Sequence, residues 1–358
     1  MSEATLRTET LRGTTNADHL VARWLFAVAA MVFGAVVIGG LTRLTESGLS
    51  ITDWRPLTGW LPPMSDEAWQ ATFDGYKRIP EYHAFNAGMT LDEFKGIFWL
   101  EYIHRLWGRL IGLVFAVPFV WFAVTRRLDR RLAWILAGLF LLGGVQGGIG
   151  WYMVSSGLTD RTDVSQYRLA LHLGVALVIY VCLLLTALWL RRSRAPWTAA
   201  TAGWRSGLWV LLALVGVTVL SGAFVAGLNA GMTYNTFPLM DGVLVPSYLY
   251  EGSPIWRAAF EDIATVQFNH RVLAVITFAA IVVAWLVSRR PAETPAVSRS
   301  LSVILAAAVL QVTLGIATLL SVVAMELAVL HQAGAVVLIT AVVWAVDHIG
   351  RGDTRPDR

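Results

Sequence analysis

Long apolar runs separated by short polar segments dominate the pattern of the chain. Each run holds about 20 apolar residues, enough for a helix to cross about 30 Å of hydrocarbon. Such runs lie near 21–41, 97–124, 132–152, 169–190, 206–228, 267–288, 301–324 and 328–349. The pattern therefore predicts an all-α fold: a polytopic membrane protein with eight transmembrane helices.

Composition and charge agree with a membrane protein and add its orientation. Hydrophobic residues make up 56% of the 358 residues and charged residues only 15%. Arginine is concentrated in 125–131, 191–205 and 288–300, whereas the alternate segments mix acids with their few bases. The positive-inside rule places these three segments and both termini in the cytoplasm. The net charge of +4 therefore reports topology, and no basic and aromatic interleaving outside the runs predicts a nucleic-acid partner.

The second half of the chain repeats the first. SGLSITDWRPLTG (47–59) is echoed by AGMTYNTFPLMDG (230–242), and LALHLGVALVIY (169–180) by AVLHQAGAVVLIT (328–340). Each half holds four runs, an even number, so both halves enter the membrane in the same direction. We expect two tandem parallel four-helix bundles. Their boundaries are a cytoplasmic tail at 1–20, an N-terminal half at 21–190, a C-terminal half at 206–349 and a second cytoplasmic tail at 350–358.

Four of the seven histidines are matched between the halves: His104, His172, His270 and His331. Each follows the point at which the chain re-enters the membrane from the outer side, so we expect all four at one depth near the outer face. An ionisable residue inside a membrane is costly and marks a functional site by default. The other three, His19, His83 and His348, fall in tails or loops and are expected to be solvated.

Paired imidazoles in a four-helix bundle are typical of a metal or haem site. A zinc or di-iron centre would need more ligands than the sequence offers, because Glu101 is the one acid beside these histidines and Cys182 is the one cysteine. Haem iron needs only two axial side chains, since the porphyrin supplies the other four nitrogens. We therefore predict histidine-ligated haem in each half.

Two further pairs of matched polar residues accompany the histidines. Arg105 and Arg271 each follow a repeat histidine directly, and a guanidinium group is suited to bind a haem propionate. Snorkelling to the nearby interface is the alternative for both arginines. Gln146 and Gln311 either hydrogen-bond polar atoms of the site or join helices, and the sequence slightly favours the second role.

Glu101 is where the halves differ. It precedes His104 by three residues, so both project from one helical face, whereas the equivalent position in the second half is Gln267. A desolvated carboxylate beside a haem can move protons or stabilise a developing cation. We expect the chemistry in the first half and plain electron transfer in the second. The alternative is an interfacial carboxylate paired with Arg105 or Arg109.

Several motifs together resemble the haem A synthase family. They are GGLTRLTESGLSITDWRPLTGWLPP (39–63), EYIHRLWGR (101–109), AGMTYNTFPLMDG (230–242) and the histidine motifs at 270–271 and 330–332. The resemblance extends over about residues 20 to 350. It implies oxidation of the C8 methyl group of haem O to a formyl group, giving haem A for terminal oxidase assembly.

The resemblance also implies which residues do what. It implies a haem b between His270 and His331, and a substrate site for haem O, which becomes haem A, at Glu101 and His104 with His172 as partner. It further implies a multi-pass protein of the cell inner membrane that works with a haem O synthase, oxidase assembly factors and an electron donor that the sequence does not identify. Homo-oligomerisation stays open.

One feature departs from part of the family. Many bacterial members carry a cysteine pair in the first outer loop, but residues 42–96 contain no cysteine. The chain thus resembles the cysteine-free branch shared by mitochondria and some bacteria. Both long outer segments, 42–96 and 229–266, are expected to be ordered lids with short helices.

Two other classes compete with a synthase. A diheme b-type electron-transfer protein would carry stacked haems at two depths, and the single depth of the four histidines weakens that alternative. A non-enzymatic haem carrier would have no need of the difference between Glu101 and Gln267.

Overall fold

The computed structural model describes residues 15–349, apart from 57, 160, 192–198 and 252–253. Within these residues eight helices are long and apolar enough to cross a membrane, which confirms the predicted fold class. They are α2 (Asn16–Leu44), α5 (Leu91–Val124), α6 (Arg130–Val154), α7 (Gln166–Leu190), α8 (Ala199–Gly227), α10 (Ile263–Val287), α11 (Pro295–Leu320) and α12 (Met325–Ile349).

Several helix ends differ from the predicted spans by up to seven residues, and two of the differences have a clear local cause. The span expected from 97 begins at Leu91, because Thr90 and Glu93 form a capping box that satisfies the first free N–H groups of α5. The span expected to end at 324 ends at Leu320. The apolar residues Val322 and Val323 have positive φ and turn the chain. Hydropathy follows composition, whereas helix ends follow backbone hydrogen bonds.

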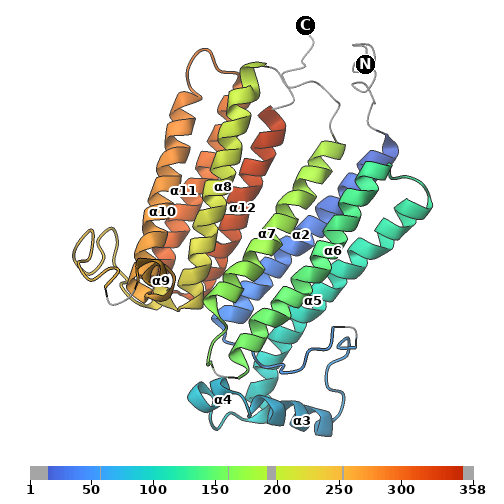
Figure 1. Cartoon of the computed structure of the whole chain (residues 1–358), viewed down its shortest axis with the longest axis vertical. Helices are drawn as coiled ribbons and strands as arrows, with labels where there is room; N and C mark the ends of the chain where they lie inside the picture. Colours follow the sequence, from blue (N-terminus) through green and yellow to red (C-terminus); the bar gives the residue numbers. More distant parts are fainter. Residues whose placement is uncertain (1–14, 57, 160, 192–198, 252–253, 350–358) are drawn as a thin grey trace.

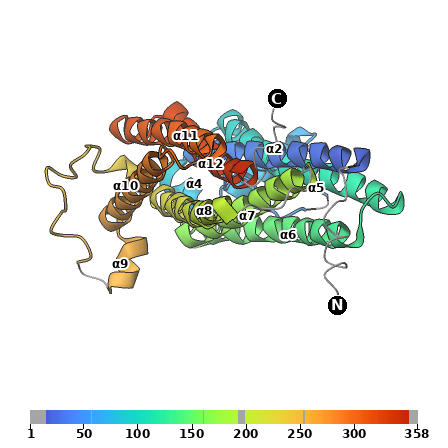
Figure 2. The ribbon, with the colours of Figure 1, turned by 90° about the horizontal axis from the view of Figure 1, so that it is seen from above.

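The helices form two rings of four (Figure 1). In the first ring the neighbours run α2, α5, α6, α7 and back to α2, so that α5 and α7 are diagonally opposite. In the second ring they run α8, α10, α11, α12 and back to α8, so that α10 and α12 are diagonal. This arrangement, also visible along the helices in Figure 2, is consistent with the predicted tandem bundles.

The two rings share a long interface. Helices α2 and α7 pack against α12, and α7 also packs against α8. Gln332 donates a hydrogen bond from α12 to the carbonyl of Val36 in α2 (2.7 Å). At the lid end of α2, Arg43 forms an ion pair with Asp163 (3.4 Å) and donates to Asn229 (2.9 Å). Polar contacts therefore join the halves across an otherwise apolar core.

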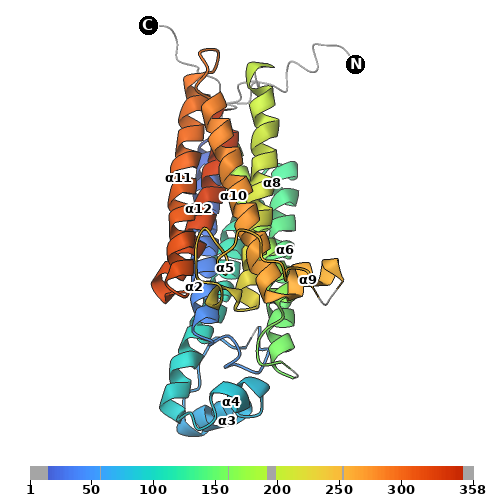
Figure 3. The same ribbon diagram turned by 90° about the vertical axis from the view of Figure 1, so that its left-hand side faces the viewer.

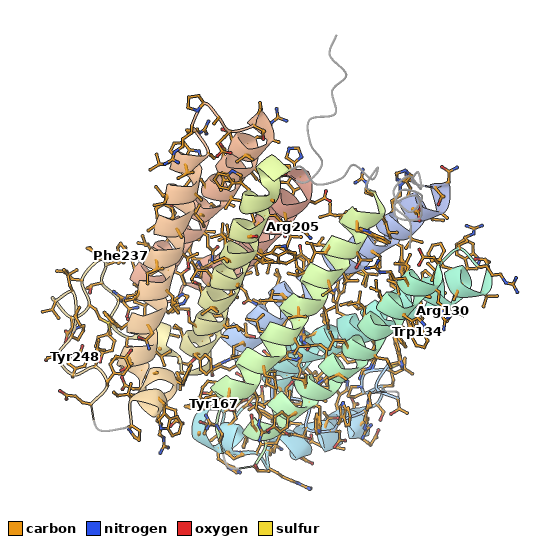
Figure 4. The ribbon with its side chains drawn as sticks, turned by 45° about the horizontal axis from the view of Figure 1, so that its top comes forward. Arg130, Trp134, Tyr167, Arg205, Phe237 and Tyr248 are labelled. Atoms are coloured by element: carbon orange, nitrogen blue, oxygen red, sulfur yellow. The ribbon has the colours of Figure 1, made fainter. Side chains whose placement is uncertain are left out.

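Ordered segments cover one end of both rings, as predicted. The first lid, residues 45–90, contains α3 (Asp66–Tyr76) and α4 (Pro80–Phe85) and projects beyond the helices in Figure 3. The second lid, residues 228–262, contains a 3-10 turn (Ala230–Met232) and α9 (Ile255–Glu261). It includes Phe237 and Tyr248 and lies beside α10 (Figure 4).

The three unmatched histidines do not share one environment. His19 and His83 are exposed, as predicted. The prediction for His348 was wrong, because this residue lies inside α12 and its ring stacks on Trp344 with 4.7 Å between ring centroids. Position 348 falls within the predicted run 328–349, which ends at the same residue as α12.

The first lid packs against the start of α5 through a small apolar core. Phe73 and Tyr76 of the lid, Phe94 of α5 and neighbouring apolar residues build this core. A carboxyl group, Glu81, is buried in it. Tyr76 donates its hydroxyl hydrogen to Glu81 (2.8 Å), and Asn86 donates to the Tyr76 oxygen (2.7 Å). Burial raises the pKa of Glu81 to about 7, assisted by the charges of nearby carboxylates and opposed by the Tyr76 hydrogen bond.

Glu81→Gln is expected to stabilise the first lid at pH 8 and to leave it unchanged at pH 4. The folded lid retains a proton that the unfolded chain releases near pH 4.5, so lid stability falls as pH rises from about 4.5 to about 7, by roughly 3 kcal/mol in all. Hydrogen exchange of the α3 and α4 amides, compared between variant and wild type at each pH, measures this. Glu67→Gln, on the exposed face of α3, is the control. Equal protection of wild type and Glu81→Gln at pH 8 would contradict the prediction.

Candidate functional site

The four matched histidines form one pair in each half. His104 lies on α5 and His172 on α7, while His270 lies on α10 and His331 on α12. Each pair therefore spans diagonally opposite helices of its ring. All four imidazoles are half-buried, so each pair faces the interior of its own bundle.

Each imidazole packs against a glycine of a neighbouring helix. A Cβ atom added to that glycine would lie within about 3 Å of the imidazole Cε1. The pairs are Gly39 with His104 (2.9 Å), Gly150 with His172 (2.9 Å), Gly222 with His270 (3.1 Å) and Gly315 with His331 (2.8 Å). The sequence analysis missed these four cradle glycines. Their recurrence at matched places in the two halves was the available signal.

Three of the four imidazoles also have a hydrogen-bond partner at Nδ1. Gln146 lies 3.1 Å from Nδ1 of His172, and Gln311 lies 3.1 Å from Nδ1 of His331. Ser221 lies 2.8 Å from Nδ1 of His270. The sequence analysis treated helix joining and contact with the site as alternatives, but Gln146 does both. It joins α6 to α7 through the carbonyl of His172 (2.9 Å) and also contacts the imidazole.

The side-chain amides of Gln146 and Gln311 bear on which imidazole nitrogen is free to bind a metal. The Oε1 atoms of Gln146 and Gln311 are buried without a partner among the described residues. A half-turn of the Gln311 amide brings Oε1 to Nδ1 of His331, where it accepts the Nδ1–H and leaves the Nε2 lone pair free, whereas the Gln146 amide is held by its hydrogen bond to the carbonyl of His172. Within the described ranges no Nε2 atom of the four histidines makes a hydrogen bond. This donor set fits two axial ligands to a haem iron in each half.

A bare metal ion fits less well. In the part of the chain that the structure describes, no group of three or more His, Cys, Asp or Glu side chains gathers closely enough to hold one. Two imidazoles with free Nε2 atoms complete the coordination of iron only when a macrocycle supplies the remaining four nitrogens.

Both carboxylate oxygens of Glu101 accept hydrogen bonds. The carboxylate is 2% exposed. Its Oε2 accepts hydrogen bonds from the hydroxyl of Ser50 (2.7 Å) and the N–H of Ile51 (2.8 Å), and its Oε1 accepts two from Arg105 (3.0 and 2.6 Å). Arg105 in turn donates to the carbonyls of Ile51 (2.7 Å) and Asp53 (2.9 Å). The Glu101–Arg105 pair thus attaches the first lid to α5.

The second half attaches its lid in the same way without the charge. Gln267 donates to the carbonyls of Ala230 (2.7 Å) and Thr233 (2.6 Å) and accepts from Arg271 (2.9 Å). Arg271 donates to the carbonyls of Tyr234 (2.6 Å) and Thr236 (2.8 Å). In both halves a residue and an arginine four positions later hold a lid over the histidine pair.

These contacts change the picture of the two arginines. Lid carbonyls occupy most of the donors of Arg105 and Arg271. Some donors stay open: Nε of Arg271 and Nη1 of Arg109 are buried and have no partner among the described residues. An anionic group of a ligand, such as a propionate, would satisfy them.

Gly315→Ala is expected to weaken haem binding in the second half by roughly 10- to 100-fold. The added methyl group would lie 2.8 Å from His331 Cε1, so the imidazole must move, and overpacking of this kind costs about 1–3 kcal/mol. Haem content per purified protein measures the effect. Gly112→Ala is the matched control, since a Cβ there meets nothing within 4 Å. Equal haem content in both variants would mean that the cradle does not position the ligand.

The family model and the most similar relatives found by comparison with known proteins agree with one another. The family described as cytochrome oxidase assembly protein matches residues 22–343. The chain is 53% identical over 342 residues to the heme A synthase of Rhodospirillum centenum, with 95% of this chain and 91% of the relative covered. It is 49% identical over 345 residues to the heme A synthase of Parvibaculum lavamentivorans, covering 96% and 98%. It is also 48% identical over 331 residues to that of Nitrosospira multiformis, covering 92% of each chain.

Proposed function

This chain belongs to the haem A synthase family of cytochrome oxidase assembly proteins, and on that premise we propose that it is a membrane oxidoreductase that converts the C8 methyl group of haem O to the formyl group of haem A. The observation that carries the proposal is a histidine pair under a lid in both halves, with the buried carboxylate of Glu101 beside the pair in the first half and Gln267 at the equivalent position in the second. One site is equipped for proton chemistry and the other is not.

The N-terminal half, 21–190, is the substrate half in this proposal. Haem O binds with its iron between His104 and His172, and the first lid closes over it. Two successive oxidations convert the methyl group to an alcohol and then to a hydrated aldehyde, which loses water. The oxygen atoms come either from dioxygen, where each oxidation takes up two electrons and two protons from a donor and releases one water, or from water, where each oxidation passes two electrons to an external acceptor and releases two protons.

Glu101 and His104 lie on one face of α5, one helical turn apart. In the reaction Glu101 takes up a proton or stabilises positive charge beside the methyl group, exchanging one of its lid hydrogen bonds for the substrate. Arg105 holds the carboxylate in place through its two hydrogen bonds. Removal of water from this closed site strengthens these interactions.

The C-terminal half, 206–349, holds a haem b in this proposal, with His270 and His331 as ligands. A haem b bound there supplies a one-electron relay. Ser221 and Gln311 orient the two imidazoles, and Arg271 holds the lid while its open Nε is available to a propionate. Arg105 has the equivalent place in the first half, where the open donor belongs to Arg109.

The same proposal places the protein in the cell inner membrane with both termini cytoplasmic and both haem sites near the outer face. A haem O synthase and oxidase assembly factors are the partners that such a reaction would need, because haem O is insoluble in water and its product is consumed by an oxidase. The surrounding lipid contacts the apolar outer faces of the helices.

Pigment extraction from membranes tests the function. Membranes that contain this chain and a supply of haem O are expected to yield haem A, and membranes with haem O but without the chain are expected to yield none. Haem b alone, with haem O unchanged, would place the protein among diheme electron-transfer proteins. Haem O bound and released without conversion would make it a haem carrier.

A further inference from the structure

His104 differs from the other three imidazoles in lacking an Nδ1 partner among the described residues. His172, His270 and His331 each have a side-chain partner within 3.1 Å of Nδ1. Nδ1 of His104 is buried and makes no hydrogen bond within the described part of the chain. The cradle glycine is nevertheless present, since Gly39 packs on His104 as Gly222 packs on His270. The two sites therefore share a shape and differ in one polar contact.

The structural cause is a single position beside the cradle glycine. Ser221 directly precedes Gly222, whereas Ile38 directly precedes Gly39. The Ser221 hydroxyl donates its hydrogen to the carbonyl of Thr218 (2.7 Å). Its oxygen must therefore accept the Nδ1–H of His270, which fixes the tautomer with a free Nε2 lone pair. The isoleucine side chain of Ile38 offers neither a donor nor an acceptor.

An Nδ1 partner strengthens a histidine ligand. The partner fixes the ring orientation and makes Nε2 more basic, and its loss lowers metal affinity by about 10- to 100-fold. Gln146 donates to the carbonyl of His172 on the opposite helix and contacts its Nδ1, which fixes the orientation of that ring. Of the two ligands in the first half, one is supported and one is not, and the unsupported ligand is the weaker one.

We propose that His104 is the axial ligand that releases the iron of haem O, while His172 stays bound. This inference rests on the proposed function and names the coordination change within it. The Nε2–iron bond breaks, the electron pair stays on Nε2, and one iron position opens on the α5 side, where Glu101 lies one turn away. In the second half Ser221 keeps His270 bound, so the relay haem stays six-coordinate.

Carbon monoxide binding tests the proposal, because CO binds reduced haem only after an axial ligand has left. Wild-type protein, purified with haem O and reduced, is expected to bind CO in the fraction of its haem that extraction identifies as haem O. Ile38→Ser, which copies Ser221, is expected to slow CO binding by about 10- to 100-fold. Ile38→Ala is the matched control, because it leaves similar space without a hydroxyl group, and is expected to bind CO at least as fast as wild type.

A reciprocal variant tests the same rule in the other half. Ser221→Ala is expected to make the haem b fraction reactive toward CO, and it gives a result even where Ile38→Ser does not fold. Equal CO rates in wild type, Ile38→Ser and Ile38→Ala would overturn the proposal, and so would CO binding by the second-half haem b in wild-type protein whose first half holds haem O.

The ligand test is separable from the synthase test. Protein reconstituted with added haem b in both halves has the same ligands, so the CO experiment is read without any conversion of haem O. Unchanged haem O in extracted membranes together with an Ile38→Ser effect would reject the synthase function and retain the role of His104. Haem A formation with no Ile38→Ser effect would retain the synthase function and reject the role of His104. A first half that binds no haem would also overturn the role of His104.

Discussion

Replacing Glu101 by Gln is expected to lower haem A formation by about 100-fold or more and to leave haem O bound. A positioned acid or base contributes about 10²- to 10⁴-fold to a reaction, and glutamine keeps the size of the side chain but cannot take up a proton. Pigment extraction from membranes supplied with haem O measures the ratio of haem A to haem O. Haem O is expected to accumulate in the variant.

The lid contacts of Glu101 require a control of their own. In Glu101→Gln the new amide would turn an NH2 group toward the donors of Ser50 and Ile51 or toward those of Arg105, so the lid would loosen as well. Ser50→Ala removes one of these lid hydrogen bonds and keeps the carboxylate. It is expected to raise hydrogen exchange in the first lid while conversion falls by less than about tenfold. Equal losses of conversion in both variants would mean that Glu101 acts only as a lid anchor.

His331→Ala is expected to remove haem b from the second half, to stop haem A formation and to leave haem O in the first half. Loss of an Nδ1 partner alone weakens a histidine ligand by about 10- to 100-fold, and loss of the ligand itself exceeds that. The cradle at Gly315 and the amide of Gln311 then face an empty space. Chromatography of extracted haems and the low-spin electron paramagnetic resonance signal measure both sites separately.

His83→Ala is the control for this change, since His83 is an exposed histidine in the first lid, and it is expected to retain both haems. Loss of haem O in His331→Ala with haem b retained would reverse the assignment of the two halves. Loss of both haems together with loss of the folded protein would require the milder Gln311→Leu, for which a partial loss of haem b is expected.

The solvent, the helices and the candidate ligands all follow from the amino-acid sequence. A helix in hydrocarbon must satisfy its own backbone and present apolar side chains, so eight apolar runs predict eight helices. The internal duplication then identified His104, His172, His270 and His331, because a costly ionisable residue repeated at matched places inside the membrane is easily read from the chain. It also identified a difference beside these histidines, which is Glu101 in the first half and Gln267 at the equivalent position in the second.

How those residues are held depends on contacts between segments far apart in the chain. Glu101 meets Ser50 across 51 positions of the chain, and Arg105 and Arg271 bind lid carbonyls, which every residue possesses and no sequence pattern distinguishes. The cradle glycines and the Nδ1 partners depend on which helices become neighbours. Ile38 looks like any apolar membrane residue until packing places Gly39 against His104 and leaves that imidazole without the support that Ser221 gives to His270.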